Sequence, residues 1–357
     1  MKTLILGDIS PTQVTSPYYE KEDLKTLFTD TLPIFEGKDL IFANLECAIT
    51  EHDQPIKKFG PPLKSPLKTA KILKELGIGY VSLSNNHIFD FGIKGIKDTV
   101  KALSDYGIKY TGFGTDYESS RKNLIIEKNG EKLAFISVCE HEYSYALSDR
   151  MGSRPFDEFD TLEDIREAKK ENDRVIVTYH GGKEESRYPS PRLLKACRAM
   201  AKAGADVILC QHSHCIGCYE DYEGCHILYG QGNFHFVKPE LLPNEKKPYW
   251  ESGFAVNYDT ITHKIEFTPI LTIKEGITLA KDEKKEEILS EFELRNEEIK
   301  NGKWKDGWKA FCESKRKAYT DVITGGNFDN FAHYLDCEAH TDVWRELFPT
   351  WNQTNEK

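Results

Sequence analysis

Short apolar runs recur along the first two thirds of the chain, and each spans only a few residues. Nearly continuous apolar runs of this kind are typical of β-strands that are buried on both faces of a sheet. On this pattern we predict buried strands at Leu4–Leu6, Leu40–Ala43, Tyr80–Leu83, Val175–Tyr179 and Val207–Cys210.

Helical patterns with recognisable ends lie between these runs. Ser65 is suited to cap a helix that has Pro66 at its first position and stops at Gly77. Two more helices are expected over 92–107 and 190–204, and both segments end at a glycine. An Asn129-Gly130 pair between β-rich segments predicts a tight hairpin. Strands that alternate with helices indicate a layered α/β fold with a largely central sheet flanked by helices.

The segment after residue 274 has a different character. Residues 281–300 form a charged helical pattern, and four of the five Trp, at positions 304, 308, 344 and 351, follow it. Large aromatic side chains bury much apolar area, so we expect these to pack against the rest of the protein. We therefore predict a main domain over 1–274 and a helical, Trp-containing C-terminal extension over 275–357 that packs on it.

Charge and composition exclude several classes of protein. The chain has 357 residues, with 48 Lys+Arg against 58 Asp+Glu, and its formal net charge is −10. An acidic balance argues against general nucleic-acid binding. No apolar run approaches the roughly 20 residues that span a bilayer, and the first apolar stretch is too short for the core of a signal peptide. We therefore expect a cytoplasmic protein.

Nine cysteines are scattered along the chain. An odd number without a small-domain framework favours a reducing compartment and mostly free thiols. Four of them gather at Cys210, Cys215, Cys218 and Cys225, a spacing that also fits a structural zinc ion or redox exchange. Because Cys210 lies within an apolar strand run, we favour packed thiols.

Polar residues that can bind a metal follow each of the five predicted strands. In α/β folds the chemistry gathers where strands give way to loops at their carboxyl ends. The five runs lead to Gly7-Asp8, to Asn44-Leu45-Glu46, to Ser84-Asn85-Asn86-His87, to His180-Gly181-Gly182 and to Gln211-His212-Ser213-His214. One such string alone would be weak evidence, but five in succession predict a shared site.

The residue types at these strand ends suit a pair of metal ions. His212 and His214 are two residues apart, so an extended chain would point both to one side. Glu46 is the natural carboxylate to bridge two cations, with Asp8 as terminal negative charge and Asn86 as an amide oxygen. Mixed nitrogen and oxygen ligands without thiolate suit Mn, Fe or Zn. Two such ions, roughly 3.5–4 Å apart, would activate a water and clamp the oxygens of a phosphoryl displacement.

These strings together resemble the CapA family, which is associated with bacterial capsule and poly-gamma-glutamate synthesis and is similar to calcineurin-like metallophosphoesterases. The resemblance covers residues 1–272 and includes four further features: Asp90 after Asn85-Asn86-His87, Lys183-Glu184 after His180-Gly181-Gly182, Gly204-Ala205-Asp206 before the last His pair, and a closing Tyr229-Gly230-Gln231-Gly232-Asn233-Phe234. It implies a calcineurin-like, layered metallophosphoesterase-type fold. The C-terminal extension lies outside it.

The resemblance also implies roles for single residues. The metal ligands would be Asp8, Glu46, Asn86, His180, His212 and His214. His87 would be the acid that protonates the leaving oxygen, with Asp90 nearby to orient it. From its position three residues on, we also expect Asp90 to accept the other ring proton of His87 and raise its basicity. Two positions depart from the calcineurin-like pattern: Ser10 stands where a ligating His is common, and Gly181 where an aromatic residue is usual.

A second group of residues is predicted to bind substrate. Lys183, Arg187 and Arg192 follow His180 and can meet an anionic substrate, or can simply form a solvated loop and helix face. Asn233 would reach the site if the last motif folds back, or it shapes a turn. Asn44 is the remaining candidate. His141, His235, His333 and His340 show no partner pattern and are taken as structural.

The function that fits these observations best is a metal-dependent phosphoester hydrolase with two divalent ions, acting in capsule or surface-polymer biosynthesis. One alternative is a non-catalytic assembly factor that keeps the metal site and binds an anionic polymer or a partner protein. A second alternative is a dimetal nuclease, which the acidic charge disfavours. The expected partners are an anionic phosphorylated or polymeric substrate and a membrane-bound polymer-synthesis complex. The sequence leaves the substrate and oligomeric state open.

Overall fold

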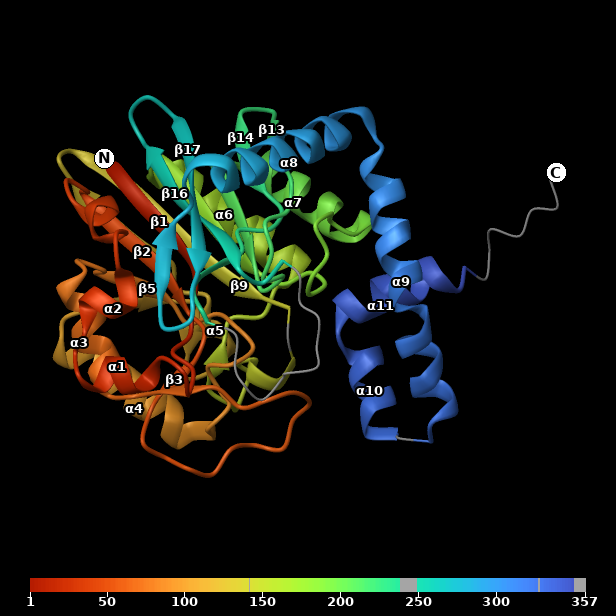
Figure 1. Ribbon diagram of the computed structural model, residues 1–357, viewed down its shortest axis with the longest axis horizontal. Coiled ribbons are helices and arrows are strands. Elements are labelled where there is room, and N and C mark those ends of the chain that lie inside the picture. The colour runs from red at the N-terminus through yellow and green to blue at the C-terminus, as the bar shows by residue number, and fades with distance from the viewer. Residues whose placement is uncertain (141, 238–248, 327, 350–357) are drawn as a thin grey trace.

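Two β-sheets stacked face to face, with helices on their outer sides, form the body of the protein (Figure 1). The structure is a computed structural model, and it describes residues 1–140, 142–237, 249–326 and 328–349. The layered α/β prediction, with central sheets flanked by helices and with C-terminal helices, is confirmed.

The first sheet combines a parallel half with an antiparallel half. Its order is β18 (Ile277–Leu279), β17 (Lys264–Thr272), β16 (Ser252–Asp259), β1 (Lys2–Ile9), β2 (Leu40–Leu45), β5 (Tyr80–Ser82) and β6 (Lys109–Thr111), with β15 (Asn233–His235) also paired to β1. The strands β1, β2, β5 and β6 run parallel, so their carboxyl ends share one edge of the sheet. Three predicted strands lie here.

The second sheet carries the other two predicted strands. Its order is β13 (Tyr219–Tyr222), β14 (Cys225–Leu228), β12 (Val207–Gln211), β11 (Arg174–His180), β9 (Glu131–Cys139) and β8 (Leu124–Lys128). The strands β9, β11 and β12 are parallel. The predicted hairpin joins β8 to β9, and Asn129 and Gly130 both have positive φ, as a two-residue turn of this kind requires.

Three hydrophobic clusters of described residues hold the layers together. Alternate residues of one strand enter different clusters: Leu4 and Leu6 face the helices, whereas Ile5 faces the second sheet. Between the sheets, the rings of Phe42 and Phe135 stack with centroids 4.5 Å apart. Burial on both faces is therefore the reason that these strands read as continuous apolar runs.

The flanking helices follow the predicted pattern with one correction. α4 (Gly92–Asp105) and α7 (Pro191–Ala203) end before glycines with positive φ, as predicted, and Ser190 Oγ accepts from Leu193 N at 3.1 Å. α3 (Lys68–Glu75), however, starts later than predicted. Ser65 does not cap it, because the backbone of Ser65 pairs with Ile49 in a short parallel ladder.

The remaining elements are α1 (Ser16–Glu20), α2 (Leu24–Phe28), α5 (Tyr117–Ser120), α6 (Glu158–Glu171), β3 (Ala48–Ile49), β4 (Lys64–Ser65), β7 (Phe113–Gly114) and β10 (Gly152–Ser153), with 3₁₀ turns at Leu32–Phe35 and Glu142–Ser144.

Within the described part of the predicted extension, β18 belongs to the first sheet, and four helices follow it: α8 (Asp282–Asn301), α9 (Trp304–Thr324), α10 (Phe328–Asp336) and α11 (Glu338–Leu347). In Figure 1, α8 crosses the top of the view and α9 to α11 stand beside the body. Trp304 and Trp308 are buried in the same cluster as Leu193 of α7, while Trp351 lies outside the described residues. Arg192 Nε also lies 3.0 Å from Asp342 Oδ2 of α11. The extension is thus in apolar and polar contact with the body.

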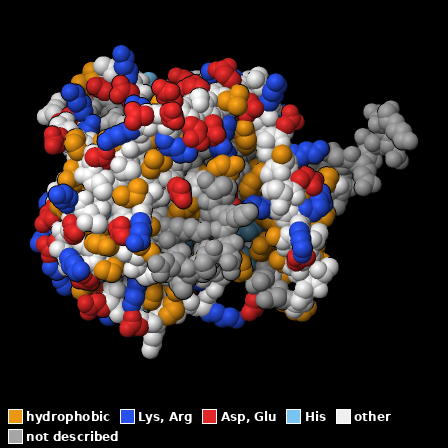
Figure 2. Space-filling model, in the orientation of Figure 1, with side chains coloured by type: hydrophobic (Ala, Val, Ile, Leu, Met, Phe, Trp, Pro, Cys, Tyr) orange, Lys and Arg blue, Asp and Glu red, His pale blue; other side chains and the backbone are white. Residues whose placement is uncertain are grey.

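The surface charge, the helices and the cysteines each bear on what the composition predicts. On the face drawn in Figure 2, Lys and Arg side chains are interspersed with Asp and Glu and do not gather into one basic surface. Among the described residues, no helix is both long enough and apolar enough to cross a membrane. All nine cysteines are buried thiols, and the described groups of side chains with metal-binding geometry contain none of them.

Candidate metal centre

The predicted metal ligands converge where five strands end. Asp8 lies near the end of β1, Glu46 directly follows β2, and Asn86 follows β5. His180 is the last residue of β11, and His212 follows β12. Among the described residues, two groups of side chains have donor atoms within 4.8 Å of one another: Asp8 with Glu46 and His180, and Glu46 with His212 and His214. Glu46 belongs to both groups, which is the geometry expected of a carboxylate that bridges two cations.

The Glu46 carboxylate is fully buried and has no hydrogen bond from the part of the chain that the structure describes. Neither of its oxygens accepts one from a described residue, although Oε1 lies 3.2 Å from His180 Nε2. Burial, and then the neighbouring Asp8, raise the pKa of Glu46 well above its ordinary value. A buried carboxylate without donors is costly for a fold unless a cation compensates it. The donor set therefore fits a divalent metal ion.

Asp8 is held by two donors and by its position at the strand end. Asn44 Nδ2 donates to Asp8 Oδ1 at 2.8 Å, and the backbone N–H of His212 donates to Oδ2 at 3.1 Å. Burial raises the pKa of Asp8 to about 6 despite these hydrogen bonds. The two donors fix the carboxylate in one orientation.

The backbone at the last His pair differs from the extended chain that the sequence predicts. β12 ends at Gln211, and His212 and His214 have φ of 79° and 53°. Both residues thus occupy the left-handed region, which few non-glycine residues adopt and which is often found at functional sites. Their rings still lie near each other, with centroids 5.8 Å apart, because the tight turn replaces the strand in bringing them together.

His180 and Asn86 bring opposite sheets to one point. His180 Nε2 lies 2.9 Å from Asn86 Oδ1, and its ring centroid is 5.0 Å from that of His212. His180 ends a strand of the second sheet, whereas Asn86 follows a strand of the first. The centre therefore spans the junction between the two sheets.

His87 sits beside the ligands in a buried ion cluster. Its Nδ1 lies 2.6 Å from Asp90 Oδ2, as predicted, and 3.1 Å from the ammonium of Lys58, which also pairs with Asp90. Asp90 favours protonation of His87, but burial and then Lys58 lower its pKa overall. The predicted effect of Asp90 on His87 is thus present, but the net pKa of His87 is lowered. For Asp90, burial is outweighed by His87 and Lys58, and its pKa is lowered.

The sequence does not single out Lys58. It stands next to Lys57 in a polar loop, yet the Lys57 side chain is 89% exposed and that of Lys58 is 2% exposed. Only the fold distinguishes them, because Lys58 turns inward to Asp90.

Two of the predicted substrate-binding residues contact side chains that are candidate metal ligands. Asn44 joins Asp8 and lies 3.2 Å from His180 Nδ1. Asn233 is aligned with Asp8 across β1 and β15, and its Oδ1 lies 2.9 Å from His214 Nδ1. Both asparagines are buried and orient metal-ligand candidates, a contact known to tune metal affinity.

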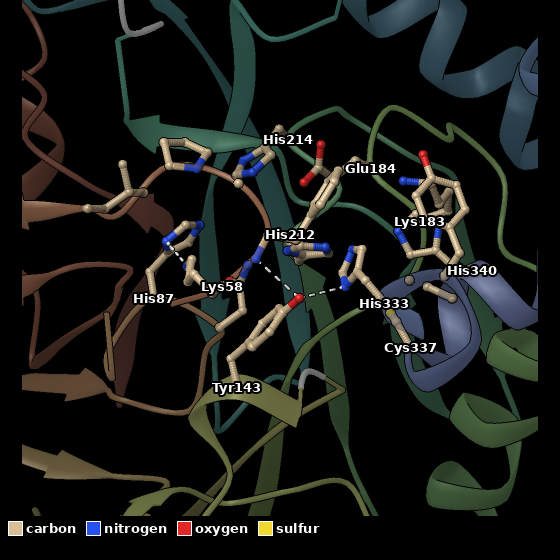
Figure 3. A pocket seen from close by; sticks show the side chains of 18 of the residues that line it. Lys58, His87, Tyr143, Lys183, Glu184, His212, His214, His333, Cys337 and His340 are labelled. Atoms are coloured by element: carbon tan, nitrogen blue, oxygen red, sulfur yellow. Dashed lines mark hydrogen bonds between the residues drawn. The ribbon is translucent and has the colours of Figure 1, made fainter. Parts of the chain in front are cut away.

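A cavity of about 420 Å³ opens beside the centre (Figure 3). Asn86, His87, His212 and His214 line one part of it. Lys183 is a predicted substrate-binding residue, Gly182 and Glu184 belong to the same motif, and His333 and His340 are predicted to be structural. The sequence does not single out the remaining lining residues: Lys58, Phe59, Gly60, Pro61, Leu63, Tyr143, Phe236, Trp250, Tyr334, Cys337 and Ala339. His235 is buried between Tyr19 and Phe28, away from this lining, and His141 lies outside the described residues.

The three cationic side chains predicted to bind substrate after His180 lie in different places in the structure. Lys183 lines the cavity. Arg187 instead pairs with Glu291 of α8 and covers the ring of Tyr249, and Arg192 pairs with Glu140 and Asp342. The two arginines therefore tie the C-terminal helices to the body, and neither lines the cavity.

Gly181 departs from the calcineurin-like pattern for a steric reason. A Cβ at this position would overlap the Glu140 carboxylate and approach the Tyr179 ring to 2.8 Å. The same carboxylate accepts from Gly182 N at 2.6 Å. A larger side chain at residue 181 would displace Glu140 from this hydrogen bond.

The fold and the centre define a layered α/β protein with carboxylates and imidazoles gathered at its strand ends. A family model described as "Bacterial capsule synthesis protein PGA_cap" matches residues 2–238, and the chain belongs to this family. The resemblance to CapA proteins seen in the motifs is confirmed.

Two relatives illustrate the match. The PGA biosynthesis protein CapA of Bacillus subtilis is 30% identical over 238 residues, which cover 65% of this chain and 62% of that protein. The capsule biosynthesis protein CapA of Bacillus anthracis is 29% identical over 241 residues, covering 65% of this chain and 59% of that protein. The chain thus spans about three fifths of each relative. A hypothetical protein from Thermus thermophilus aligns over 78% of this chain and 98% of its own, at 16% identity and a TM-score of 0.43, which is too low to bear on the assignment.

Proposed function

We propose that this protein is a metal-dependent hydrolase that cleaves a phosphoester during the synthesis of a capsule or another surface polymer. The observation that carries the proposal is the buried Glu46 carboxylate, which has no hydrogen bond from a described residue and is shared by two ligand groups. A protein that used this edge only for packing would gain nothing from a buried charge of this kind.

Six residues would hold two divalent ions: Asp8, Glu46, Asn86, His180, His212 and His214. Such ions lower the pKa of a bound water and stabilise charge on phosphoryl oxygens. Asn44 and Asn233 keep Asp8 and His214 in orientation through the hydrogen bonds described above. The absence of thiolate from this set favours Mn, Fe or Zn in a reactive site over a structural zinc.

His87 would supply the proton for the leaving oxygen. It lines the cavity and is placed by Asp90, whose Oδ2 lies 2.6 Å from its Nδ1. The Nδ1 side is thereby engaged, so Nε2 is the nitrogen available to a substrate. Lys58 compensates the Asp90 charge, and its proximity favours release of the proton from His87.

Metal analysis followed by a substrate panel tests the proposal. Purified protein is loaded with Mn, Fe or Zn in turn and assayed with phosphomonoesters and phosphodiesters of graded leaving group. We expect about two equivalents of metal and turnover of at least one ester class. Absence of turnover with every metal would contradict the hydrolase.

A non-catalytic role in polymer assembly is the second candidate. It draws on the name of a further relative, a probable polyglutamine synthesis accessory protein of Mycobacterium tuberculosis, 28% identical over 208 residues. In this role the centre would bind an anionic polymer or a partner in a membrane-bound synthesis complex. Metal binding without turnover, together with retention of the polymer, would favour it.

A further inference from the structure

The cavity beside the metal centre has a wall that the family match does not include. The match ends at residue 238, whereas His333 and Tyr334 of α10, Cys337, and Ala339 and His340 of α11 line the same cavity as His87 and His212. Figure 3 shows the imidazoles of His333 and His340 around the cavity that His212 and His214 also line. The C-terminal helices therefore do more than cover apolar surface.

The two imidazoles of this wall are held in defined positions. His333 stacks on Phe59 with ring centroids 4.5 Å apart, and its Nδ1 lies 2.9 Å from the Tyr143 hydroxyl. That hydroxyl also accepts from the backbone N–H of Phe59 at 3.2 Å. These contacts connect α10 to the loop that carries Lys58.

His340 is anchored within the extension itself. Its Nδ1 lies 2.7 Å from the Tyr319 hydroxyl, and its ring centroid is 4.3 Å from that of Tyr334. A wall held by side chains from α9, α10, α11 and the body is preorganised for a ligand, which lowers the entropic cost of binding.

Lys183 is the lysine of the cavity lining that pairs with no other residue in the described part of the chain. No described residue forms an ion pair or a hydrogen bond with its side chain, whereas the ammonium of Lys58 is committed to Asp90 and His87. Among the described lining residues, Glu184 is the single carboxylate, against two lysines and five imidazoles. Burial and then Glu184 raise the pKa of Tyr334, so that phenol remains a hydrogen-bond donor. The balance of donors and cations in the lining favours an anionic ligand.

We infer that Lys183, His333 and His340 form a subsite for a second oxyanion, a carboxylate or a phosphate, on the part of the substrate that does not react. This inference rests on the proposed function, because it assumes that the reacting phosphoryl group lies at the metal ligands. A cavity of about 420 Å³ is within the range of small-molecule sites, so the ligand is a small phosphoester with two anionic ends or the terminal unit of a chain.

Binding of non-hydrolysable phosphonates tests the subsite without any turnover. The Mn-loaded protein is titrated by calorimetry with propylphosphonate, with ω-carboxyalkylphosphonates of three chain lengths, and with alkane bisphosphonates of the same lengths. We expect one length to bind about tenfold more tightly than propylphosphonate, as a charge-assisted hydrogen bond would provide. The carboxylate and bisphosphonate series show which oxyanion the subsite prefers.

Variants then assign the gain to this wall. Lys183→Gln, and a double variant with His333→Phe and His340→Phe that keeps the rings, should reduce the gain to less than about threefold. The gain of each variant is measured relative to propylphosphonate bound to the same variant, so that a change in binding at the metal ligands is not counted as a loss of the subsite. Lys317→Gln, which removes an exposed α9 cation paired with Asp321, is the matched control and should keep the full gain.

Two negative results are distinguishable. Tight binding of propylphosphonate with no gain from any second anion, or a gain that all the variants keep, would overturn the subsite and leave the proposed function standing. If no phosphonate binds to protein that holds its metal, the proposed function fails and the subsite fails with it.

Discussion

The cavity has two walls of different origin, and they differ in how far the sequence reveals them. One wall consists of residues that follow parallel strands, such as His87 and His212, and the other consists of residues on α10 and α11, such as His333 and His340. Strand ends meet at one sheet edge whatever the loops do, so position along the chain predicts position in space. A helix in an extension has no such constraint, and its imidazoles resemble those of any surface helix.

Loss of a ligand should produce the largest effect. His180→Ala or His212→Ala should lower bound metal below two equivalents while the circular dichroism spectrum stays native, because both residues lie at strand ends and neither belongs to a hydrophobic cluster. His52→Ala, which removes an imidazole outside the cavity, serves as control. Near-wild-type metal content in both ligand variants, measured by mass spectrometry, would overturn their assignment.

Loss of the acid should slow turnover and leave the metal in place. His87→Asn should reduce kcat by roughly 10²–10⁴-fold, most for esters with poor leaving groups and least for activated aryl phosphates. That contrast separates an acid from a ligand, because ligand loss slows every substrate. A His87→Asn protein that has lost its metal would show that His87 is itself a ligand.

Loss of a residue that orients a ligand should have a smaller effect. Asn233→Ala removes the partner of His214 Nδ1, and metal affinity should fall by about 10–100-fold. Asn301→Ala, at the exposed end of α8, is the control and should bind metal as the wild type does. Equal affinities in a chelator competition assay would show that Asn233 only shapes its turn.

Removal of the C-terminal helices should have the smallest effect on the metal. A chain that ends at residue 280 should retain its metal but form oligomers or aggregates, which light scattering detects. The reason is that truncation exposes the apolar surface that Trp304 and Trp308 cover. Trp308→Ala is a milder version of the truncation, because it removes one of these contacts and keeps the helices. It should lower the free energy of unfolding by about 3–5 kcal/mol. A truncated chain that stays monomeric and equally stable would identify the helices as an independent module.

The sequence predicts the body of the fold well for a physical reason. All five apolar runs are strands, and the glycines at 77, 107 and 204 end helices, since burial on both faces and positive φ leave direct marks on residue type. The start of α3 is mispredicted because the pairing of Ser65 with Ile49 is a long-range contact. Local capping patterns carry no information about such pairing.

The candidate site also has features that the sequence predicts and features that depend on long-range contacts. Strand ends bring the ligand candidates together, and their roles as ligands remain a prediction. The sequence could not reveal that Lys58 turns inward, nor that Arg187 and Arg192 face the C-terminal helices, since charge alone does not specify a partner. The sequence predicts that Asp90 favours protonation of His87, but it does not reveal that burial and Lys58 outweigh this effect and lower the pKa of His87.

The most direct test of the metal centre is an anomalous difference map from crystals of the Mn-loaded protein. The account predicts two peaks roughly 3.5–4 Å apart, on either side of the Glu46 carboxylate. A single peak that Glu46 does not touch, or no peak at the strand ends in protein shown to be saturated with metal, would contradict it.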